Sequence, residues 1–215
     1  MFNFSSFILL KQDSLEKEFC EEVIKKFEKD DRKYQGGVGD LNQYNPNLKK
    51  SMDLHISSLE EWEEEDKIFY KALGEGVKEY AQQDFLTALD KDDTTSNTIE
   101  LFSRPLHDSG YQIQRTDPGG YYKWHQDWTY RKDLGSRVLT YIWYLNDITE
   151  GGGYTDFLDG TRITPKQGTL LLFPATWTYY HRGFPPEKET KYISTGWLYY
   201  NRDLESQETN QEKLD

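Results

Sequence analysis

The chain has 215 residues, a formal net charge of −12 and one cysteine, Cys20. This length suits a single domain with a sizeable core. An acidic chain repels phosphate backbones, which argues against nucleic acid as the main partner. A single cysteine excludes an intrachain disulfide, and we expect Cys20 to be a buried thiol in a reducing compartment. No stretch is long enough to span a membrane, and the N-terminus lacks the basic region of a signal peptide, so we expect a cytoplasmic protein.

The N-terminal part is predicted to contain two helices. A short strand is expected at residues 7–10, after which Asp13 and Glu16 have the spacing of a helix capping box. The first helix is expected to end near residues 29–31. Its apolar stripe at helical spacing consists of Leu15, Phe19, Cys20, Val23, Ile24 and Phe27.

Residues 32–50 are rich in Gly, Asn and Asp, which predicts a loop, and a short strand is expected at residues 52–56. Ser57 or Ser58 is the expected cap of the second helix. That helix should run past apolar residues at helical spacing, namely Trp62, Phe69, Leu73, Val77 and Tyr80. Residues 90–97 form a polar break.

From Thr98 the sequence pattern changes to short β-type runs separated by turn residues. The expected strands cover residues 99–104, 111–115, 121–125, 138–146, 154–158, 162–164, 168–173 and 191–200. Such a series predicts a β-sandwich or a jelly-roll barrel. We expect one domain over residues 1–204, with a helical support region at 1–97, a β core at 98–204, and a disordered polar tail at 205–215.

Two potential metal ligands, His125 and Asp127, are two positions apart at the end of the predicted strand 121–125. On a strand, residues at this spacing face the same way, so the two side chains can hold one ion together. His181, after a buried apolar strand, would supply a third ligand. Two imidazoles and one carboxylate suit Fe(II) with open coordination positions, and Zn(II) is the competing metal. Because zinc hydrolases often carry two His at helical spacing, the strand-like spacing favours iron. We assign no function to His55 or His107.

Lys191 begins the last predicted strand. On that strand one face is shared by Lys191, Ile193, Thr195, Trp197 and Tyr199. A lysine buried beside apolar side chains is costly unless it is paired, and a bound carboxylate would pair it. The alternative is that Lys191 lies at the mouth of the strand and points into solvent, as most lysines do.

These residues closely resemble the prolyl 4-hydroxylase-like branch of the Fe(II)/2-oxoglutarate-dependent dioxygenases. The resemblance spans about residues 111–200. It rests on ordered stretches at 117–127 (DPGGYYKWHQD), 137–147 (RVLTYIWYLND), 150–153 (EGGG), 165–168 (PKQG), 181–186 (HRGFPP) and 191–192 (KY). The combination in this order is highly specific, whereas a His-x-Asp pair alone is a weak signal.

The resemblance implies a double-stranded β-helix (jelly-roll) core flanked by N-terminal helices, with Fe(II), 2-oxoglutarate and O2 as reactants and ascorbate as a reductant. It makes His125, Asp127 and His181 the iron ligands. It assigns Lys191 to the distal carboxylate of 2-oxoglutarate. The other implied contacts are Tyr144, Thr195 and Trp197 for the co-substrate, and Tyr122 and Arg137 for a target peptide.

Two positions depart from the family pattern. Many relatives carry a tyrosine where this chain has Thr116, so one contact to co-substrate or substrate is missing or replaced. Relatives often carry Gly at the position of Glu189, two residues before Lys191, so the preceding turn must differ. Neither departure affects the predicted metal ligands.

The function that we expect is hydroxylation of a C–H bond, most simply in a prolyl residue of a peptide or protein. The loops at residues 36–50 and 128–136 would close over such a chain. The same chemistry on a free amino acid or another small molecule is one alternative. A catalytically silent binding module with the same fold is an alternative of another class, and a zinc hydrolase is a more distant one.

Overall fold

The computed structural model describes residues 7–39, 42–82 and 106–200. The helices in these ranges are α1 (Lys17–Lys29), the short 3-10 helix η2 (Glu60–Trp62) and α2 (Glu63–Ala81). The strands are β1 (Leu9–Lys11), β2 (Tyr34–Gln35), β3 (Gly37–Val38), β4 (Gln43–Tyr44), β5 (Lys49–Lys50), β6 (Met52–His55), β7 (His107–Asp108), β8 (Gln112–Thr116), β9 (Tyr121–His125), β10 (Tyr130–Arg131), β11 (Gly135–Tyr144), β12 (Thr155–Phe157), β13 (Arg162–Ile163), β14 (Leu170–Pro174), β15 (His181–Gly183) and β16 (Lys191–Tyr200). No helix in these ranges is long and apolar enough to cross a membrane.

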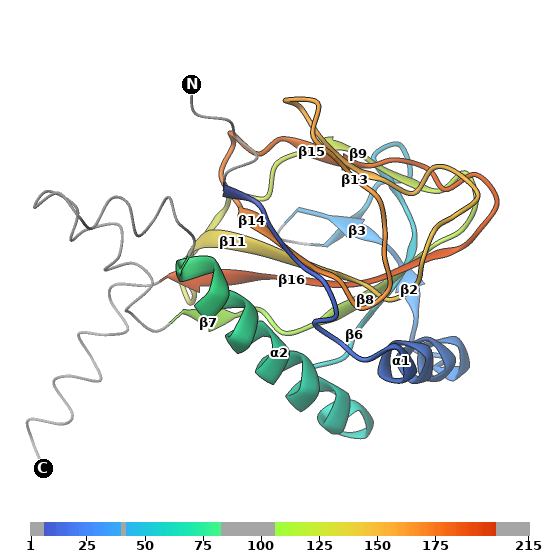
Figure 1. The fold of residues 1–215 in the computed structure, drawn as a ribbon, viewed down its shortest axis with the longest axis horizontal. Helices are drawn as coiled ribbons and strands as arrows, with labels where there is room; N and C mark the ends of the chain where they lie inside the picture. Colours follow the sequence, from blue (N-terminus) through green and yellow to red (C-terminus); the bar gives the residue numbers. More distant parts are fainter. Residues whose placement is uncertain (1–6, 40–41, 83–105, 201–215) are drawn as a thin grey trace, which may run out of the picture.

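Two antiparallel sheets form the body of the protein. The larger has the order β1-β14-β11-β16-β8-β6-β2, with β10 beside β11 and β7 beside β16. The smaller has the order β13-β12-β15-β9-β5, and β3 pairs with β4 alone. The smaller sheet lies over one face of the larger, and both helices lie on the other side (Figure 1). This arrangement confirms the predicted jelly-roll core with flanking helices.

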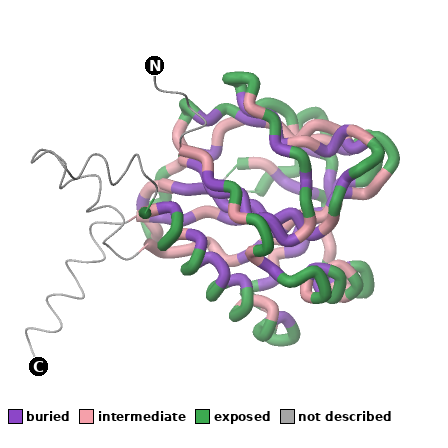
Figure 2. Tube along the Cα trace, viewed as in Figure 1, coloured by how far each residue is buried: buried purple, intermediate pink, exposed green. Residues whose placement is uncertain are grey.

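Strand alternation divides the apolar side chains between two cores. On β14, Leu170 and Leu172 face the helices and pack in a cluster with Phe27 of α1 and Phe69 of α2. Leu171 and Phe173, on the opposite face of β14, belong to a second cluster. Buried residues accordingly run along the strands and along one side of each helix (Figure 2). Cys20 is buried in the helical cluster as predicted.

The first helix ends at Lys29 as predicted, but the predicted capping box is wrong. The helix begins at Lys17, and its N-cap residue Glu16 makes no side-chain capping bond. Asp13 has a positive φ of 52° and belongs to a turn. The backbone N–H groups of the next two residues, Ser14 and Leu15, both donate to the carbonyl of Gly168. These bonds to the sheet end hold the chain away from the helix axis until Lys17.

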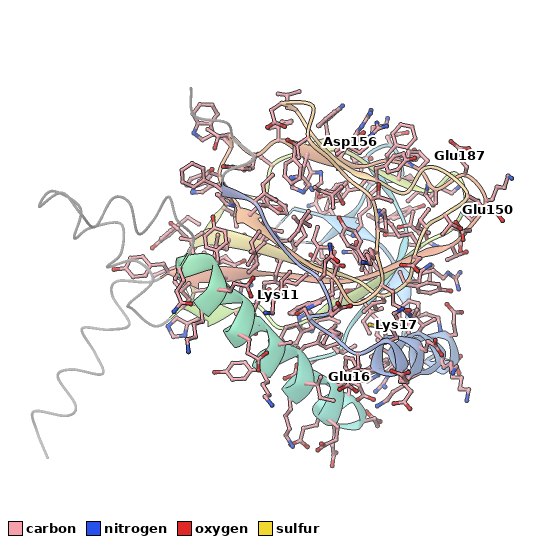
Figure 3. All side chains as sticks on the ribbon, viewed as in Figure 1. Lys11, Glu16, Lys17, Glu150, Asp156 and Glu187 are labelled. Atoms are coloured by element: carbon pink, nitrogen blue, oxygen red, sulfur yellow. The ribbon has the colours of Figure 1, made fainter. Side chains whose placement is uncertain are left out.

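The second helix is also present without the predicted serine cap. Ser57 instead accepts a hydrogen bond from the backbone N–H of Tyr111, and η2 intervenes before α2. At the other end of α2, Glu79 pairs with Lys11 of β1 at 2.6 Å, which ties the helix to the sheet edge. Lys11 is labelled beside α2 in Figure 3. Tertiary partners, rather than local caps, therefore decide where this helix starts.

The N-terminal region contributes strands as well as helices. The predicted strand at 52–56 is present as β6, whereas the predicted loop at 32–50 contains β2 to β5. Strands β1, β2 and β6 join the larger sheet and β5 joins the smaller one. The division at residues 97 and 98 stays a prediction. The predicted break at 90–97, strand at 99–104 and tail at 205–215 all lie outside the described residues.

Candidate active site

A β-bulge brings two aromatic side chains of β9 to the same side. In the pairing of β9 with β15, His125 lies opposite His181, but Tyr122 lies opposite Gly183. The pairing therefore spans three positions on β9 but only two on β15. The extra residue on β9 turns the Tyr122 side chain to the same face as the His125 side chain. The Tyr122 ring stacks on the His125 imidazole with centroids 3.6 Å apart and planes 15° apart.

The structure brings His125, Asp127 and His181 together as a group that can hold a metal ion. Their ligand atoms all lie within 4.8 Å of one another. Asp127 Oδ1 lies 3.6 Å from His125 Nε2, and Asp127 Oδ2 lies 3.6 Å from His181 Nε2. Because β9 ends at His125, the aspartate is not held by strand alternation alone. It is held from β11, where Thr140 Oγ1 donates to Asp127 Oδ2 at 2.7 Å.

Backbone carbonyls orient both imidazoles. His125 Nδ1 donates to the carbonyl of Lys123 at 2.8 Å, and His181 Nδ1 donates to the carbonyl of Tyr179 at 2.9 Å. A proton on each Nδ1 leaves each Nε2 as an acceptor that faces the aspartate. Phe173 packs edge-on against His181 with ring centroids 4.9 Å apart, which restricts rotation of that ligand.

Burial sets the protonation states at this group. Burial, followed by the charge that His181 would carry, lowers the pKa of His125 to about 3. Burial alone would raise the pKa of Asp127, but the two imidazoles and the Thr140 hydroxyl outweigh it, and this pKa is lowered. Neutral imidazole and ionised carboxylate are the forms that bind metals, so this site needs little proton release before binding.

Lys191 lies in the same cavity, whose volume is about 550 Å³. The lysine is 5 % exposed, and burial lowers its pKa from 10.5 to about 8. Its ammonium group donates to the carbonyl of Gly153 at 3.0 Å. Within the described residues no carboxylate lies in salt-bridge range of it. The solvent-facing alternative for Lys191 is therefore wrong, and a cation without a counter-ion faces the cavity.

The predicted face of the last strand is confirmed. All five of its members line the cavity: Lys191, Ile193, Thr195, Trp197 and Tyr199. Thr195 Oγ1 donates to the carbonyl of Tyr141 at 2.8 Å, so its methyl group is left for the cavity. The guanidinium of Arg137 stacks on the Trp197 ring, 3.8 Å from its centroid.

Both predicted peptide-facing residues, Tyr122 and Arg137, also line the cavity. Arg137 Nε donates to Tyr199 Oη at 2.6 Å, and Nη1 donates to the backbone carbonyl of Asp127 at 3.2 Å. A register shift in β11 between Arg137 and Leu139 lets Arg137 and Thr140 face the same way. The arginine therefore contacts both the metal group and the cavity.

Tyr144 lies behind the cavity wall and is not among the residues that line the cavity, in contrast to its expected place. It is fully buried in the cluster between the sheets, with Phe157 and Phe173. Its hydroxyl donates to Thr155 Oγ1 at 2.7 Å, and Thr155 does line the cavity. Tyr144 can therefore act on a bound molecule only by orienting Thr155.

The two departures from the family pattern have separate structural consequences. Thr116 pairs with Lys191 across β8 and β16 and lines the cavity, so the shorter side chain leaves space beside the lysine. Glu189 accepts hydrogen bonds from the backbone N–H groups of Thr149 and Glu150, at 2.6 and 2.7 Å. A glutamate carboxylate therefore holds the turn before β16.

Sequence reasoning missed several residues of the cavity. Thr140 carries a detectable signal, because it alternates with the apolar residues Leu139 and Tyr141 on β11. The others lie on β2, β5 and β8 or next to β5, and their sequence pattern gave no signal. The cavity residues missed there are Tyr34, Lys49, Ser51, Gln112 and Gln114.

A known family model matches part of the chain. Residues 111–199 match the family model described as the 2OG-Fe(II) oxygenase superfamily, over the segment that contains the metal group and Lys191. The chain resembles the prolyl 4-hydroxylase-like 2OG-Fe(II) oxygenases. It is 29 % identical over 104 residues to the prolyl 4-hydroxylase subunit alpha-1 of Gallus gallus, a match covering 41 % of this chain and 20 % of that protein. The chain thus spans about a fifth of that relative's length.

Solved structures share the fold. The viral collagen prolyl hydroxylase of Paramecium bursaria Chlorella virus-1 superposes with a TM-score of 0.63 and 20 % identity, covering 91 % of this chain and 97 % of that one. A Trichoplax adhaerens prolyl hydroxylase, solved in complex with a hypoxia inducible factor peptide fragment, superposes with a TM-score of 0.68 and 16 % sequence identity. The match covers 91 % of this chain and 84 % of that one. A Pseudomonas putida prolyl-4-hydroxylase superposes with a TM-score of 0.61 and 16 % sequence identity, and the match covers 90 % of this chain and 92 % of that one.

The residues present fit the family's cofactors, Fe(II) and 2-oxoglutarate. Two imidazoles and one carboxylate form a three-ligand set of the kind that leaves open positions on Fe(II). Lys191, a buried cation without a carboxylate partner among the described residues, suits one end of a dicarboxylate.

Replacing Thr140 with valine is expected to weaken metal binding by about 10- to 100-fold, because the Asp127 carboxylate loses the hydrogen bond that orients it. Thr140→Ser keeps the hydroxyl and is the matched control. Competition between each variant and a chelator for Co(II) measures the effect. Equal affinity in the wild type and Thr140→Val would show that Asp127 is held in place without Thr140.

Proposed function

We propose that this protein is an Fe(II)- and 2-oxoglutarate-dependent dioxygenase that hydroxylates a C–H bond of a prolyl residue in a peptide or protein. The observation that carries the proposal is the buried Lys191, which faces the same cavity as the His–Asp–His group and lacks a carboxylate partner among the described residues. Burying a charge in this way is unfavourable unless a ligand compensates it.

In this proposal His125, Asp127 and His181 hold the metal, and Lys191 holds the distal carboxylate of 2-oxoglutarate through a charge-assisted pair. Bound Fe(II) and 2-oxoglutarate supply oxygen activation, with succinate, CO2 and a hydroxylated product as the outcome, and ascorbate serves as a reductant. Thr195 and Trp197 flank the co-substrate, and Tyr144 acts through Thr155. These groups restrict the orientation of the bound molecules and keep water from the reacting carbon.

The prolyl assignment is supported by the relatives, whose names describe prolyl hydroxylases and, in one case, a bound peptide. Two segments at the cavity favour an extended substrate. The β3–β4 hairpin contributes Gly37 and Val38, and the segment after Asp127 contributes Trp128 and Arg131. Trp128 lines the cavity and is 51 % exposed, so its ring is available to contact a substrate.

Turnover assays separate this proposal from its main alternative, the same chemistry on a small molecule. With Fe(II), 2-oxoglutarate and ascorbate, we expect proline-containing peptides to stimulate succinate formation and to gain the mass of one oxygen atom. Free L-proline is the matched probe. Stimulation by the free amino acid and by no peptide would make the peptide assignment wrong. Partner binding in a protein that never turns over would instead favour a silent binding module, and metal analysis after anaerobic purification separates iron from zinc.

A further inference from the structure

A second half of the cavity lies beside the metal group and Lys191 and contains none of the predicted metal or 2-oxoglutarate ligands. The metal group and Lys191 lie toward β9, β15 and β16, whereas the other half is built on β2, β5, β6 and β8. Its lining side chains are polar: Tyr34, Lys49, Ser51, His55, Gln112 and Gln114. A cavity of about 550 Å³ also falls in the range that holds drug-sized ligands, so there is room for a substrate beside the co-substrate.

Two glutamines in this half form a directed chain. Gln114 Nε2 donates to Gln112 Oε1 at 2.6 Å, and Gln112 Nε2 donates to Tyr34 Oη at 2.8 Å. Each glutamine amide offers two N–H donors and one carbonyl acceptor. Across the described residues, Gln114 Oε1 accepts no hydrogen bond although the side chain is largely buried. The chain therefore ends in a fixed acceptor at the cavity.

A buried ion pair supplies donors beside this acceptor. Lys49 Nζ lies 2.6 Å from Asp53 Oδ2, and Ser51 Oγ donates to Asp53 Oδ1 at 2.7 Å. The side chains of Lys49 and Asp53 are 4 % and 0 % exposed. An ammonium group carries three N–H donors, and Asp53 uses one, so Lys49 has donors left for the cavity that it lines.

The donor and the acceptor are neighbours, and the ion pair beside the acceptor carries no net charge. Asp53 lies opposite Gln114 in the pairing of β6 with β8, which brings Lys49 close to the glutamine amide. The charges of Lys49 and Asp53 cancel. Burial raises the pKa of Tyr34, which therefore stays uncharged. A donor beside an acceptor with no net charge matches a neutral group that offers one carbonyl and one N–H.

We propose that this half of the cavity is a substrate subsite for a peptide amide, in which Lys49 donates to the amide carbonyl and Gln114 Oε1 accepts from the amide N–H. The inference rests on the proposed function, and it adds how a peptide is distinguished from a free amino acid. A free amino acid brings a carboxylate and an ammonium group into a region whose charges are already balanced, and burying them there is unfavourable.

The test uses the full chain loaded with Zn(II), which is diamagnetic, and with 2-oxoglutarate. The probes are the blocked tripeptide acetyl-Gly-Pro-Gly-amide and free L-proline, followed by NMR of the glutamine side-chain amides. The variants are Gln114→Leu and the double variant Lys49→Met/Asp53→Asn, which removes both charges so that neither is left buried alone. Gln35→Leu and Lys50→Met are matched controls, because these exposed residues neighbour the subsite but do not line the cavity.

We expect the blocked tripeptide to shift the Gln114 resonance, and its Kd to rise at least about fivefold in both variants and to stay unchanged in both controls. Wild-type affinity in the two variants would overturn the subsite. So would no binding of the tripeptide at millimolar concentration, or tighter binding of L-proline through the same resonances. Calorimetry of 2-oxoglutarate separates the two ideas, because only failure of the co-substrate to bind the metal-loaded wild type counts against the proposed function.

Discussion

Replacing Lys191 with methionine is expected to remove tight binding of 2-oxoglutarate and to make the protein without ligand more stable. Loss of one partner of a buried charged pair costs about 2–5 kcal/mol of binding free energy, or roughly 30- to 4,000-fold in Kd. Isothermal titration of 2-oxoglutarate into the Mn(II)-loaded protein measures this change. Lys188→Met, at an exposed lysine three residues earlier, is the matched control.

The expected gain in stability follows from the lowered pKa of Lys191. A shift from 10.5 to about 8 corresponds to about 3 kcal/mol of free energy that disfavours the buried charge. The hydrogen bond to Gly153 is lost in the variant, so we expect a net gain of about 1–3 kcal/mol in the free energy of unfolding. Chemical denaturation at pH 7 measures it. A destabilised Lys191→Met would mean that the lysine already has a compensating partner without ligand.

The pH dependence of stability has a defined sign. The folded pKa lies below the unfolded pKa, so between pH 8 and 10.5 the unfolded chain binds more protons than the folded one. The cost of burying the charge is therefore complete below pH 8 and is relieved as the pH rises toward 10.5. Over this window the wild type should gain stability relative to Lys191→Met, while its affinity for 2-oxoglutarate falls.

Replacing His125 with alanine is expected to have the second large effect, on the metal. Mutation of a group that only orients a metal ligand lowers metal affinity by up to roughly 100-fold. Removal of a ligand itself should lower the affinity further. We expect no measurable Co(II) binding by the variant at micromolar metal and no Fe(II)-dependent turnover of 2-oxoglutarate. The His125 ring is neutral at physiological pH, so its loss removes a ligand and not a charge. Retained metal affinity would exclude His125 as a ligand.

His107→Ala is the matched control for this variant, because His107 lies on β7 and does not line the cavity. His55 is unsuitable as a control. It lines the cavity and its Nε2 contacts the carbonyl of Ser109 at 3.1 Å. Circular dichroism of both variants verifies the fold, since the Tyr122 ring loses its stacking partner in His125→Ala.

Strand alternation and ordered motifs predicted the inner face of β16 and the grouping of His125, Asp127 and His181. Alternation failed where bulges change the register. Strict alternation would place Tyr122 and His125 on opposite faces of β9, and Arg137 and Thr140 on opposite faces of β11. In the structure a register shift in each strand brings both members of the pair to the cavity. Bulges depend on the partner strand, so a single sequence carries little sign of them.

The N-terminal contributions were harder to predict for a different reason. Lys49 and Asp53 lie in a polar stretch where charged residues are normally solvated, yet both are buried because β5 and β6 join different sheets at the cavity. The helix starts were mispredicted because Ser57 and the turn at Asp13 bond to distant strands. In both cases the deciding contacts are far away in the sequence.

The fate of molecular oxygen during turnover distinguishes a 2-oxoglutarate-dependent dioxygenase from a protein that only binds metal. The protein, reconstituted with Fe(II), is incubated with 2-oxoglutarate under 18O2, with and without proline-containing peptides, and succinate is analysed by mass spectrometry. We predict Fe(II)-dependent succinate that carries one 18O atom, stimulated by a peptide substrate and absent from His125→Ala. Iron-loaded wild type that forms no labelled succinate under any of these conditions would contradict the account.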